Sequence, residues 1–198
     1  VTERVPALDM VRVRQALNGS KTRLIGPNSQ GILAPEICMI GVMATGSERP
    51  GNVGIVSRSA SLTSEVVAQI SSEGLGQSTT VGVGGDPIHG MSMLQCVELF
   101  LEDSETKGIV LIGEIGGTEE QEVAEYLQGR KASKPVVALI AGQYAPPERR
   151  MGHSGTLTMY GRGDANSKIA ALERAGVQVA PSSHLVGATI RQALRQVN

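Results

Sequence analysis

The chain has 198 residues, of which 40% are hydrophobic and 19% charged, a composition typical of one sizeable globular domain and unlike that of a disordered chain. Eighteen basic residues oppose nineteen acidic ones, and the net charge of −1 argues against a nucleic-acid surface. The longest apolar runs are strand-sized, far below the roughly 20 residues of a membrane helix, so we expect no membrane partner. Two cysteines are too few for a disulfide framework, which favours a reducing compartment.

The first fifty residues are predicted to form a helix, a short strand and a connector. Pro6 can open a helix that ends at Asn18-Gly19, and residues 22–25 have the length of a short strand. Eight glycines and prolines between residues 26 and 52 exclude a long helix there. We therefore expect a loop-rich connector and a domain boundary near residue 50. Because the chain begins with Val1 and shows no signal or transit pattern, we also expect a processed chain or a fragment.

From residue 53 onward, apolar runs alternate with amphipathic segments. The expected strands cover residues 53–56, 78–83, 108–112, 136–141 and 177–179, and the expected helices cover residues 61–72, 91–101, 118–128, 166–175 and 184–196. Continuous apolar strands that alternate with such helices predict a parallel sheet covered on both faces. Since crossover connections are right-handed, the chain is expected to form a doubly wound α/β fold.

Glycine- and serine-rich loops follow four successive strands of this predicted sheet. They cover residues 57–61, 84–87, 113–117 and 142–164. The carboxyl ends of parallel strands share one edge of a sheet, and folds of this type bind their ligands there. We therefore predict a ligand site built from these four loops.

Residues 57–61 lead directly into a helix. The free N–H groups and the positive end of a helix favour an anion such as phosphate. A serine in front of a helix is equally typical of an ordinary N-cap. Both interpretations stay open on this motif alone.

His153 and Glu114 are the candidate reactive residues. His153 lies between glycines in the longest loop, where it could be a nucleophile, a proton shuttle or a metal ligand, although an exposed surface histidine is the commoner case. Glu114 ends an apolar strand, where a carboxylate needs a partner, and pairing with an imidazole would orient that ring. The alternative for Glu114 is a cap of the next helix. No cluster of cysteine and histidine supports a metal site.

Three familiar motifs are missing. The residues around His153 lack the frame of a hydrolase nucleophile elbow. The glycines at 82–85 lack the third glycine of a dinucleotide fingerprint, and no P-loop lysine is present.

Five motifs in order resemble the succinyl-CoA synthetase α-subunit family. They are Val-Gly-Ile-Val-Ser-Arg-Ser at 53–59, Val-Gly-Gly-Asp-Pro at 83–87, Ile-Gly-Glu-Ile-Gly-Gly at 112–117, Lys-Pro-Val-Val at 134–137 and Arg-Arg-Met-Gly-His at 149–153. The resemblance spans the whole chain and implies a flavodoxin-like fold. It also implies that residues 1–30 are the C-terminal part of a CoA-binding domain, that residues 31–50 form a connector, and that residues 51–198 form the CoA-ligase domain.

The resemblance implies an acid–CoA ligase that forms a nucleoside diphosphate. In the implied reaction, phosphate from the triphosphate passes to His153, whose ring Glu114 holds. It then passes to a dicarboxylic acid such as succinate. CoA attacks the acyl phosphate that results. The implied contacts are phosphate at Ser57, Ser59, Ala60 and Ser61, the acid at Ser64, Gly116 and Gly117, and CoA at Val1, Thr2, Glu3 and Ser29. The implied partner is a nucleotide-grasp β subunit that binds Mg-ATP or Mg-GTP, in a heterodimer or heterotetramer of the bacterial cytoplasm or the mitochondrial matrix.

The sequence departs from the family pattern near the expected site. Ala60 stands where the family usually has Gly, Ser64 where it has Tyr, Ser29 where it has Cys, and Ser154 where it has Ala. The short Ser64 leaves room for a larger or hydroxylated acid, so a malate- or citrate-type ligase is an alternative to a succinate ligase. A non-catalytic regulatory or scaffold subunit is a further alternative, and the presence of both His153 and Glu114 favours the enzyme.

Overall fold

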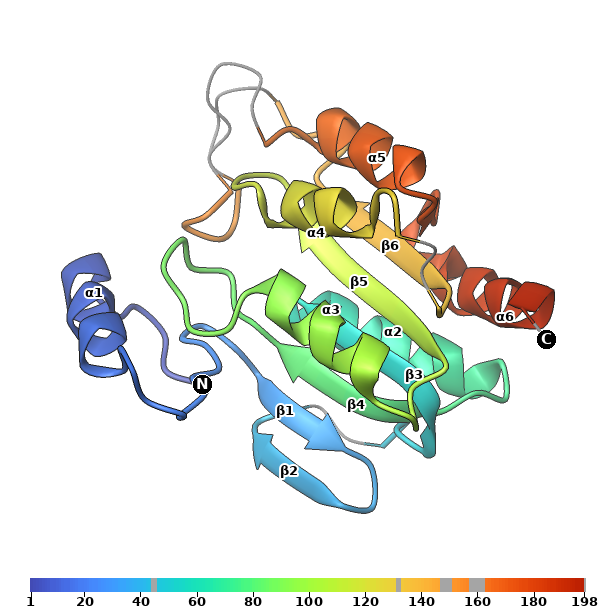
Figure 1. The fold of residues 1–198 in the computed structure, drawn as a ribbon, viewed down its shortest axis with the longest axis horizontal. Coiled ribbons are helices and arrows are strands. Elements are labelled where there is room, and N and C mark those ends of the chain that lie inside the picture. The colour runs from blue at the N-terminus through green and yellow to red at the C-terminus, as the bar shows by residue number, and fades with distance from the viewer. Residues whose placement is uncertain (44–45, 131–132, 147–150, 157–162, 198) are drawn as a thin grey trace.

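A seven-stranded sheet runs through the part of the chain that the structure describes, with helices on both faces (Figure 1). This computed structural model describes all residues except 44–45, 131–132, 147–150, 157–162 and 198. The strands are β1 (Gly31–Ala34), β2 (Cys38–Gly41), β3 (Pro50–Ser57), β4 (Gln77–Gly82), β5 (Gly108–Glu114), β6 (Val136–Ala141) and β7 (Gln178–Val179). The helices are α1 (Ala7–Ala16), α2 (Ala60–Ser72), α3 (Met93–Glu102), α4 (Glu119–Leu127), α5 (Ala165–Arg174) and α6 (Val186–Val197), the last preceded by a 3₁₀ turn, Ser183–Leu185.

The strand order β2-β1-β4-β3-β5-β6-β7 contains a parallel block from β4 to β7. Within this block the first strand along the chain, β3, lies between the second and the third, which is the flavodoxin-like order. The predicted doubly wound α/β fold is therefore confirmed. Each of the ten segments predicted after residue 50 has a counterpart in the structure, with ends that differ by a few residues.

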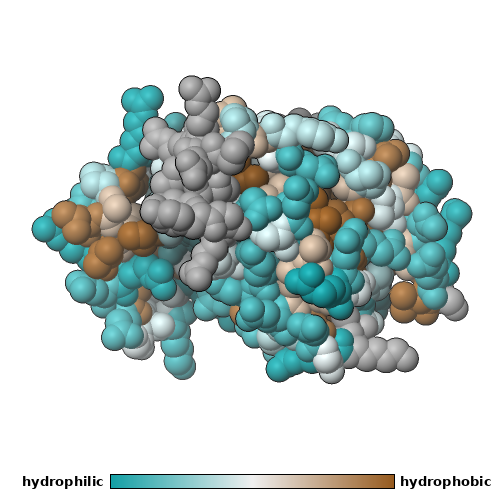
Figure 2. Space-filling model, turned by 90° about the horizontal axis from the view of Figure 1, so that it is seen from above, coloured by the Kyte–Doolittle hydropathy of each residue, from teal (hydrophilic) through white to brown (hydrophobic). Residues whose placement is uncertain are grey.

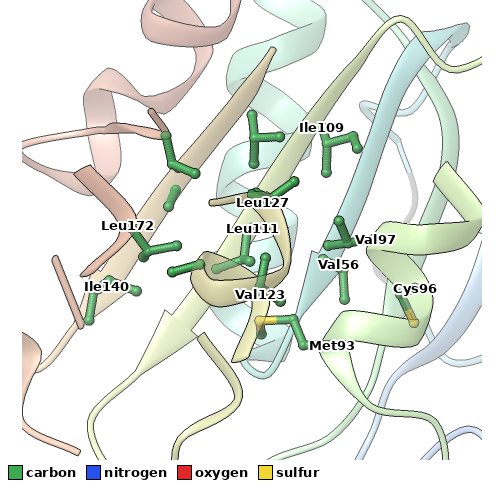
Figure 3. Packing of buried hydrophobic residues seen from close by; sticks show 14 of the residues in the cluster. Val56, Met93, Cys96, Val97, Ile109, Leu111, Val123, Leu127, Ile140 and Leu172 are labelled. Atoms are coloured by element: carbon green, nitrogen blue, oxygen red, sulfur yellow. The ribbon is translucent and has the colours of Figure 1, made fainter. Parts of the chain in front are cut away.

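Alternate residues of the parallel strands pack on opposite faces of the sheet. One core cluster lies under α3, α4 and α5, and the other under α2 and α6. Figure 3 shows the first, where helix residues Met93, Val97, Val123, Leu127 and Leu172 pack over strand residues Val56, Ile109 and Leu111. Because Val110 and Ile112 belong to the second cluster, β5 is buried on both sides, as its unbroken apolar sequence predicts.

The predicted connector contains a β-hairpin that extends the sheet. Strands β1 and β2 pair antiparallel, and β1 also pairs antiparallel with β4. Gly31 and Gly41 lie opposite each other, and a Cβ on either one would run into the backbone of the other strand. The glycines that suggested a loop therefore permit two backbones to approach closely. The division into domains at residues 30 and 50 is a separate prediction that these strands do not test.

The strand expected at residues 22–25 does not form. Its backbone pairs with a loop instead, since the carbonyl of Leu24 accepts a hydrogen bond from the amide of Met91 at 2.7 Å. The preceding helix α1 stands at one end of the molecule and buries only Met10 among its ten residues. Hydrophobic surface gathers at this end in Figure 2, where Leu8 is 73% exposed. No helix in the described ranges combines the length and the apolar character needed to cross a bilayer.

Candidate functional site

Glu114 and His153 form a hydrogen-bonded pair at the carboxyl edge of the parallel strands. The Nδ1 atom of His153 lies 2.8 Å from Oε2 and 3.0 Å from Oε1 of Glu114. Glu114 is the last residue of β5, and its side chain is 9% exposed, whereas that of His153 is 29% exposed. The interaction that the sequence predicted for this carboxylate is present, and Glu114 does not cap α4.

The carboxylate sets both the orientation and the proton affinity of the imidazole. The hydrogen bond to Glu114 raises the pKa of His153 above its ordinary value, although partial burial and the charge of Arg58 oppose the shift. An ionised carboxylate only accepts, so Nδ1 carries the proton and donates it. Among the described residues the ring hydrogen bonds only through Nδ1. Nε2 is therefore the ring nitrogen that can take up an electrophile.

Glycines let neighbouring loops close around the pair. A Cβ on Gly85, in the loop after β4, would overlap the ring of His153. The amide of Gly155 donates to the carbonyl of Gly85 at 3.3 Å. Gly116 has a φ of +86°, and a Cβ there would overlap the carbonyl of Gly155. Three of the four predicted loops thus meet at His153, each through small residues.

A buried lysine and glutamate hold the turn after β5 from behind. Nζ of Lys168 donates to the carbonyls of Glu114 at 2.7 Å and Gly116 at 2.6 Å, and it pairs with the carboxylate of Glu120. Glu120 also accepts the amide of Glu114 at 3.0 Å. Both charged side chains are fully buried. The backbone of Glu114 is therefore fixed on its donor side and on its acceptor side.

Glu120 and Lys168 were not among the residues predicted from the sequence, although a signal was available. Glu120 precedes Val123 and Leu127 by three and seven residues, and Lys168 precedes Leu172 by four. All five side chains are buried. A charge in register with the apolar stripe of a helix indicates a buried ion pair.

Arg58, another residue that the sequence analysis did not single out, reaches Glu114 from the turn between β3 and α2. Its Nε lies 3.3 Å from Oε1 of Glu114, and the side chain is 3% exposed. A second histidine–carboxylate pair lies nearby, since Nε2 of His89 is 3.3 Å from Oε1 of Glu119. Burial would raise the pKa of Glu119, but the hydrogen bond from His89 and the charges of His89 and Arg58 outweigh it and lower that pKa.

The expected phosphate contacts lie at the start of α2. Ser59 is the N-cap, and its Oγ accepts the amide of Leu62 at 3.3 Å. Ser57 is buried, and its Oγ bonds the backbone of Ser59. Ala60 and Ser61 are exposed in the first turn. The N-cap interpretation is thus correct, and the helix start is also open to an anion.

The expected acid contacts differ from one another in accessibility. Ser64 is half-buried and its Oγ donates to the carbonyl of Ala60 at 3.3 Å. Gly116 is buried and uses its amide on the carbonyl of Gly163 at 2.7 Å, whereas Gly117 is exposed. Only Ser64 and Gly117 therefore present accessible surface.

An open cavity of about 760 Å³ lies between the N-terminal segment and His153. Of the expected CoA contacts, Glu3 lines it, together with Arg4, Asp86 and Ser154. Val1 and Thr2 are exposed. Ser29 is buried away from solvent, where its Oγ donates to the carbonyl of Gly82 and accepts the amide of Gly31 at 2.9 Å.

Asp86 joins both sides of this cavity. It accepts hydrogen bonds from Oγ of Ser154 at 2.9 Å and from Nδ2 of Asn28 at 3.2 Å. Arg149 and Arg150, the start of the fifth motif, lie outside the described residues. No cluster of three potential metal ligands occurs among the side chains that the structure describes.

The strand order and the Glu114–His153 pair identify a flavodoxin-like domain with a histidine held by a carboxylate at the carboxyl edge of its parallel strands. The model of the CoA-ligase family matches residues 56–178, and the chain belongs to this family. It is 46% identical over 196 residues to the succinate–CoA ligase [ADP-forming] subunit alpha of Staphylococcus aureus, covering 99% of this chain and 65% of that subunit. The corresponding subunit of Staphylococcus epidermidis is also 46% identical, with the same coverage of this chain and of that subunit. The resemblance predicted from the five motifs is confirmed, and the chain spans about two thirds of these relatives.

Solved structures agree with this assignment. ATP citrate lyase from Methanothrix soehngenii, in complex with citrate and coenzyme A, superimposes with a TM-score of 0.87 at 29% identity, over 98% of this chain and 33% of that one. A dinucleotide-forming acetyl-coenzyme A synthetase from Ca. Korarchaeum cryptofilum shares the fold, with a TM-score of 0.67 at 20% identity over 95% of this chain and 38% of that one.

Proposed function

We propose that the chain is the α-type part of a nucleoside-diphosphate-forming acid–CoA ligase, with His153 as the phosphate carrier. The observation that carries the proposal is the Glu114–His153 hydrogen bond, which leaves Nε2 as the reactive nitrogen at the ligand-binding edge of the sheet. The names of the relatives add the reaction class. A non-catalytic subunit would not need a carboxylate fixed beneath a partly exposed imidazole.

The proposed reaction is a relay of one phosphoryl group. The lone pair of Nε2 attacks the terminal phosphorus of the triphosphate, a P–O bond breaks, and the diphosphate leaves. Glu114 stabilises the positive charge that develops on the ring. A carboxylate oxygen of the acid then attacks phosphorus and the P–N bond breaks. The thiolate of CoA finally attacks the acyl carbon and releases phosphate.

The start of α2 is the proposed resting place of the phosphoryl group. Its exposed first turn, at Ala60 and Ser61, offers backbone N–H groups at the positive end of a 13-residue helix. Arg58, immediately before the N-cap, contacts Glu114 and so joins this turn to the histidine pair. The roles of Ser57 and Ser59 are then to shape the turn, because their hydroxyls bond its backbone.

The remaining substrates require a second chain. The cavity beside Glu3 and His153 is the proposed approach of CoA, and Ser29 would act only through the backbone it holds. Mg-ATP or Mg-GTP is proposed to bind a nucleotide-grasp β subunit, in a heterodimer or heterotetramer. Both cysteines are unpaired, which fits the reducing cytoplasm or mitochondrial matrix that this role implies.

The size of the acid is the point on which two candidates differ. The names of the relatives support succinate. A larger, hydroxylated acid such as malate or citrate is favoured by Ser64, a small side chain on the second turn of α2, and by the citrate complex of the similar lyase.

Acyl-CoA formation tests the proposal. The subunit that contains this chain is combined with the nucleotide-grasp subunit of the same organism, a triphosphate and CoA, and succinate, malate and citrate are offered in turn. We expect one acid to yield acyl-CoA together with diphosphate, and His153→Asn to abolish the product. The chain without its partner should give none. Product from the Asn variant would refute the role of His153.

A further inference from the structure

Arg58 is the one buried arginine among the described residues of the site, and it contacts β5 through both its backbone and its side chain. Its backbone amide donates to the carbonyl of Ile112 at 3.1 Å, which joins the end of β3 to β5. Its Nε lies 3.3 Å from Oε1 of Glu114, the oxygen that is also 3.0 Å from Nδ1 of His153. Arginine and imidazole therefore approach the same carboxylate oxygen.

The guanidinium lies where the glycine loops converge. A Cβ on Gly155 would be 2.7 Å from Nη2, and one on Gly117 would be 3.5 Å from Nη1. The loop that carries His153 and the loop that follows Glu114 thus both pack against this group. A side chain on Gly155 would displace the guanidinium.

Arg58 also faces a second carboxylate. Its positive charge acts on Glu119, whose carboxylate pairs with His89 at 3.3 Å. Nε of Arg58 is buried and makes no hydrogen bond with a described residue, so its interaction with Glu114 is electrostatic. The charge of Arg58 therefore acts on both Glu114 and Glu119, and each of these carboxylates pairs with one histidine.

The Glu114–His153 pair has to meet two opposing chemical requirements. A carboxylate at 2.8 Å stabilises the imidazolium, but only a neutral ring has the lone pair on Nε2 that can attack phosphorus. We propose that Arg58 is a positioning residue, whose guanidinium offsets the charge of Glu114 so that the carboxylate orients His153 and leaves the ring free to react. The inference rests on the proposed role of His153 as phosphate acceptor.

The charged groups around His153 come from five places in the fold. Glu114 on β5 and Asp86 after β4 raise its pKa, whereas Arg58 before α2 lowers it. Lys168 on α5 touches the backbone of Glu114, and Glu119 on α4 pairs with His89. Of these, Arg58 is the cation that both contacts the carboxylate of Glu114 and lowers the pKa of His153.

Titration of the imidazole rings tests the inference without any ligase activity. The full chain has three histidines, and each ring is assigned in proton–nitrogen NMR spectra from single replacements. In Arg58→Gln the midpoint of His153 should rise by about one pH unit, because a charge that opposes protonation is gone. In Arg58→Lys, which keeps the charge, the midpoint should return to that of the wild type. His184, whose ring faces Ser182 ahead of α6, serves as the internal reference and should not move.

An unchanged or lowered midpoint in Arg58→Gln would overturn the inference, as would a Lys variant that shifts as far as the Gln variant. If Arg58→Gln does not fold, Glu119→Gln gives the opposite test. Arg58 would then act on Glu114 alone, and the midpoint of His153 should fall; a rise or no change would contradict the inference. Failure of the ligase assay with these shifts intact would refute the proposed function and leave only the effect of Arg58 on the protonation of His153 standing.

Discussion

Lys168 and Glu114 are joined through the backbone, since Nζ of the buried lysine donates to the carbonyl of the glutamate at 2.7 Å. The carboxylate of Glu114 is thereby free to face His153, while its main chain is fixed by Lys168 and by Glu120. Such support keeps a reactive pair in its geometry without occupying its functional atoms. The fully buried ion pair is thus part of the site although it touches no reactive atom.

Removal of Lys168 should destabilise the whole domain. Lys168→Met leaves Glu120 buried without its cation, and the loss of one partner of a buried pair costs about 3–5 kcal/mol. Urea unfolding measures the change in the free energy of unfolding. Lys107→Met, on an exposed lysine, is the matched control and should change it by less than about 0.5 kcal/mol. Equal losses in the two variants would contradict the account of Lys168.

A methyl group on Gly85 should push the imidazole away from Glu114. A Cβ there overlaps the ring of His153, so Gly85→Ala should lower the NMR titration midpoint of His153 by weakening its hydrogen bond. In a His153→Ala background the same methyl group meets no ring, and its cost to stability should shrink. An equal cost in both backgrounds would show that the clash lies elsewhere.

The stability of the chain should depend on pH through His153. Its pKa is raised in the folded state, chiefly by the hydrogen bond to Glu114, so its contribution to stability is full below its unfolded value of about 6.5 and is lost as pH rises through the folded value. His153→Asn should therefore cost more stability at pH 5 than at pH 9 in urea unfolding. A larger cost at pH 9 would reverse the sign and contradict the pairing.

The first turn of α2 should bind inorganic phosphate weakly. Ser61→Pro removes one N–H from that turn, where proline is tolerated. Because the positive end of a helix stabilises an anion by about 0.3–1 kcal/mol, the variant should bind phosphate about two- to fivefold more weakly. Ser61→Ala keeps the amide and is the control. Calorimetry measures both. Wild-type affinity in the Pro variant would show that this amide does not contact the anion.

The parallel sheet could be predicted from local patterns, and the Glu114–His153 pair could be predicted because both residues follow strands that end at one edge of that sheet. Apolar runs predicted β3, β5 and β6, and the ends of these parallel strands predicted that the loops lie on one edge of the sheet. The hairpin could not be predicted, since Gly31 and Gly41 act through contact across strands that the local sequence does not reveal. Arg58 was missed for a similar reason: its partners Glu114 and Glu119 lie more than fifty residues away, and only the fold brings them together.

Phosphorylation of His153 shows whether this residue is the phosphate carrier. The subunit that contains the chain, with its nucleotide-grasp partner, is given a triphosphate labelled at the terminal phosphate, and the labelled peptide is mapped. We expect an acid-labile, base-stable phosphate on Nε2 of His153 that disappears when acid and CoA are added, and no label in His153→Asn. Label that persists in that variant, or that maps to another residue of the wild type, would contradict the account.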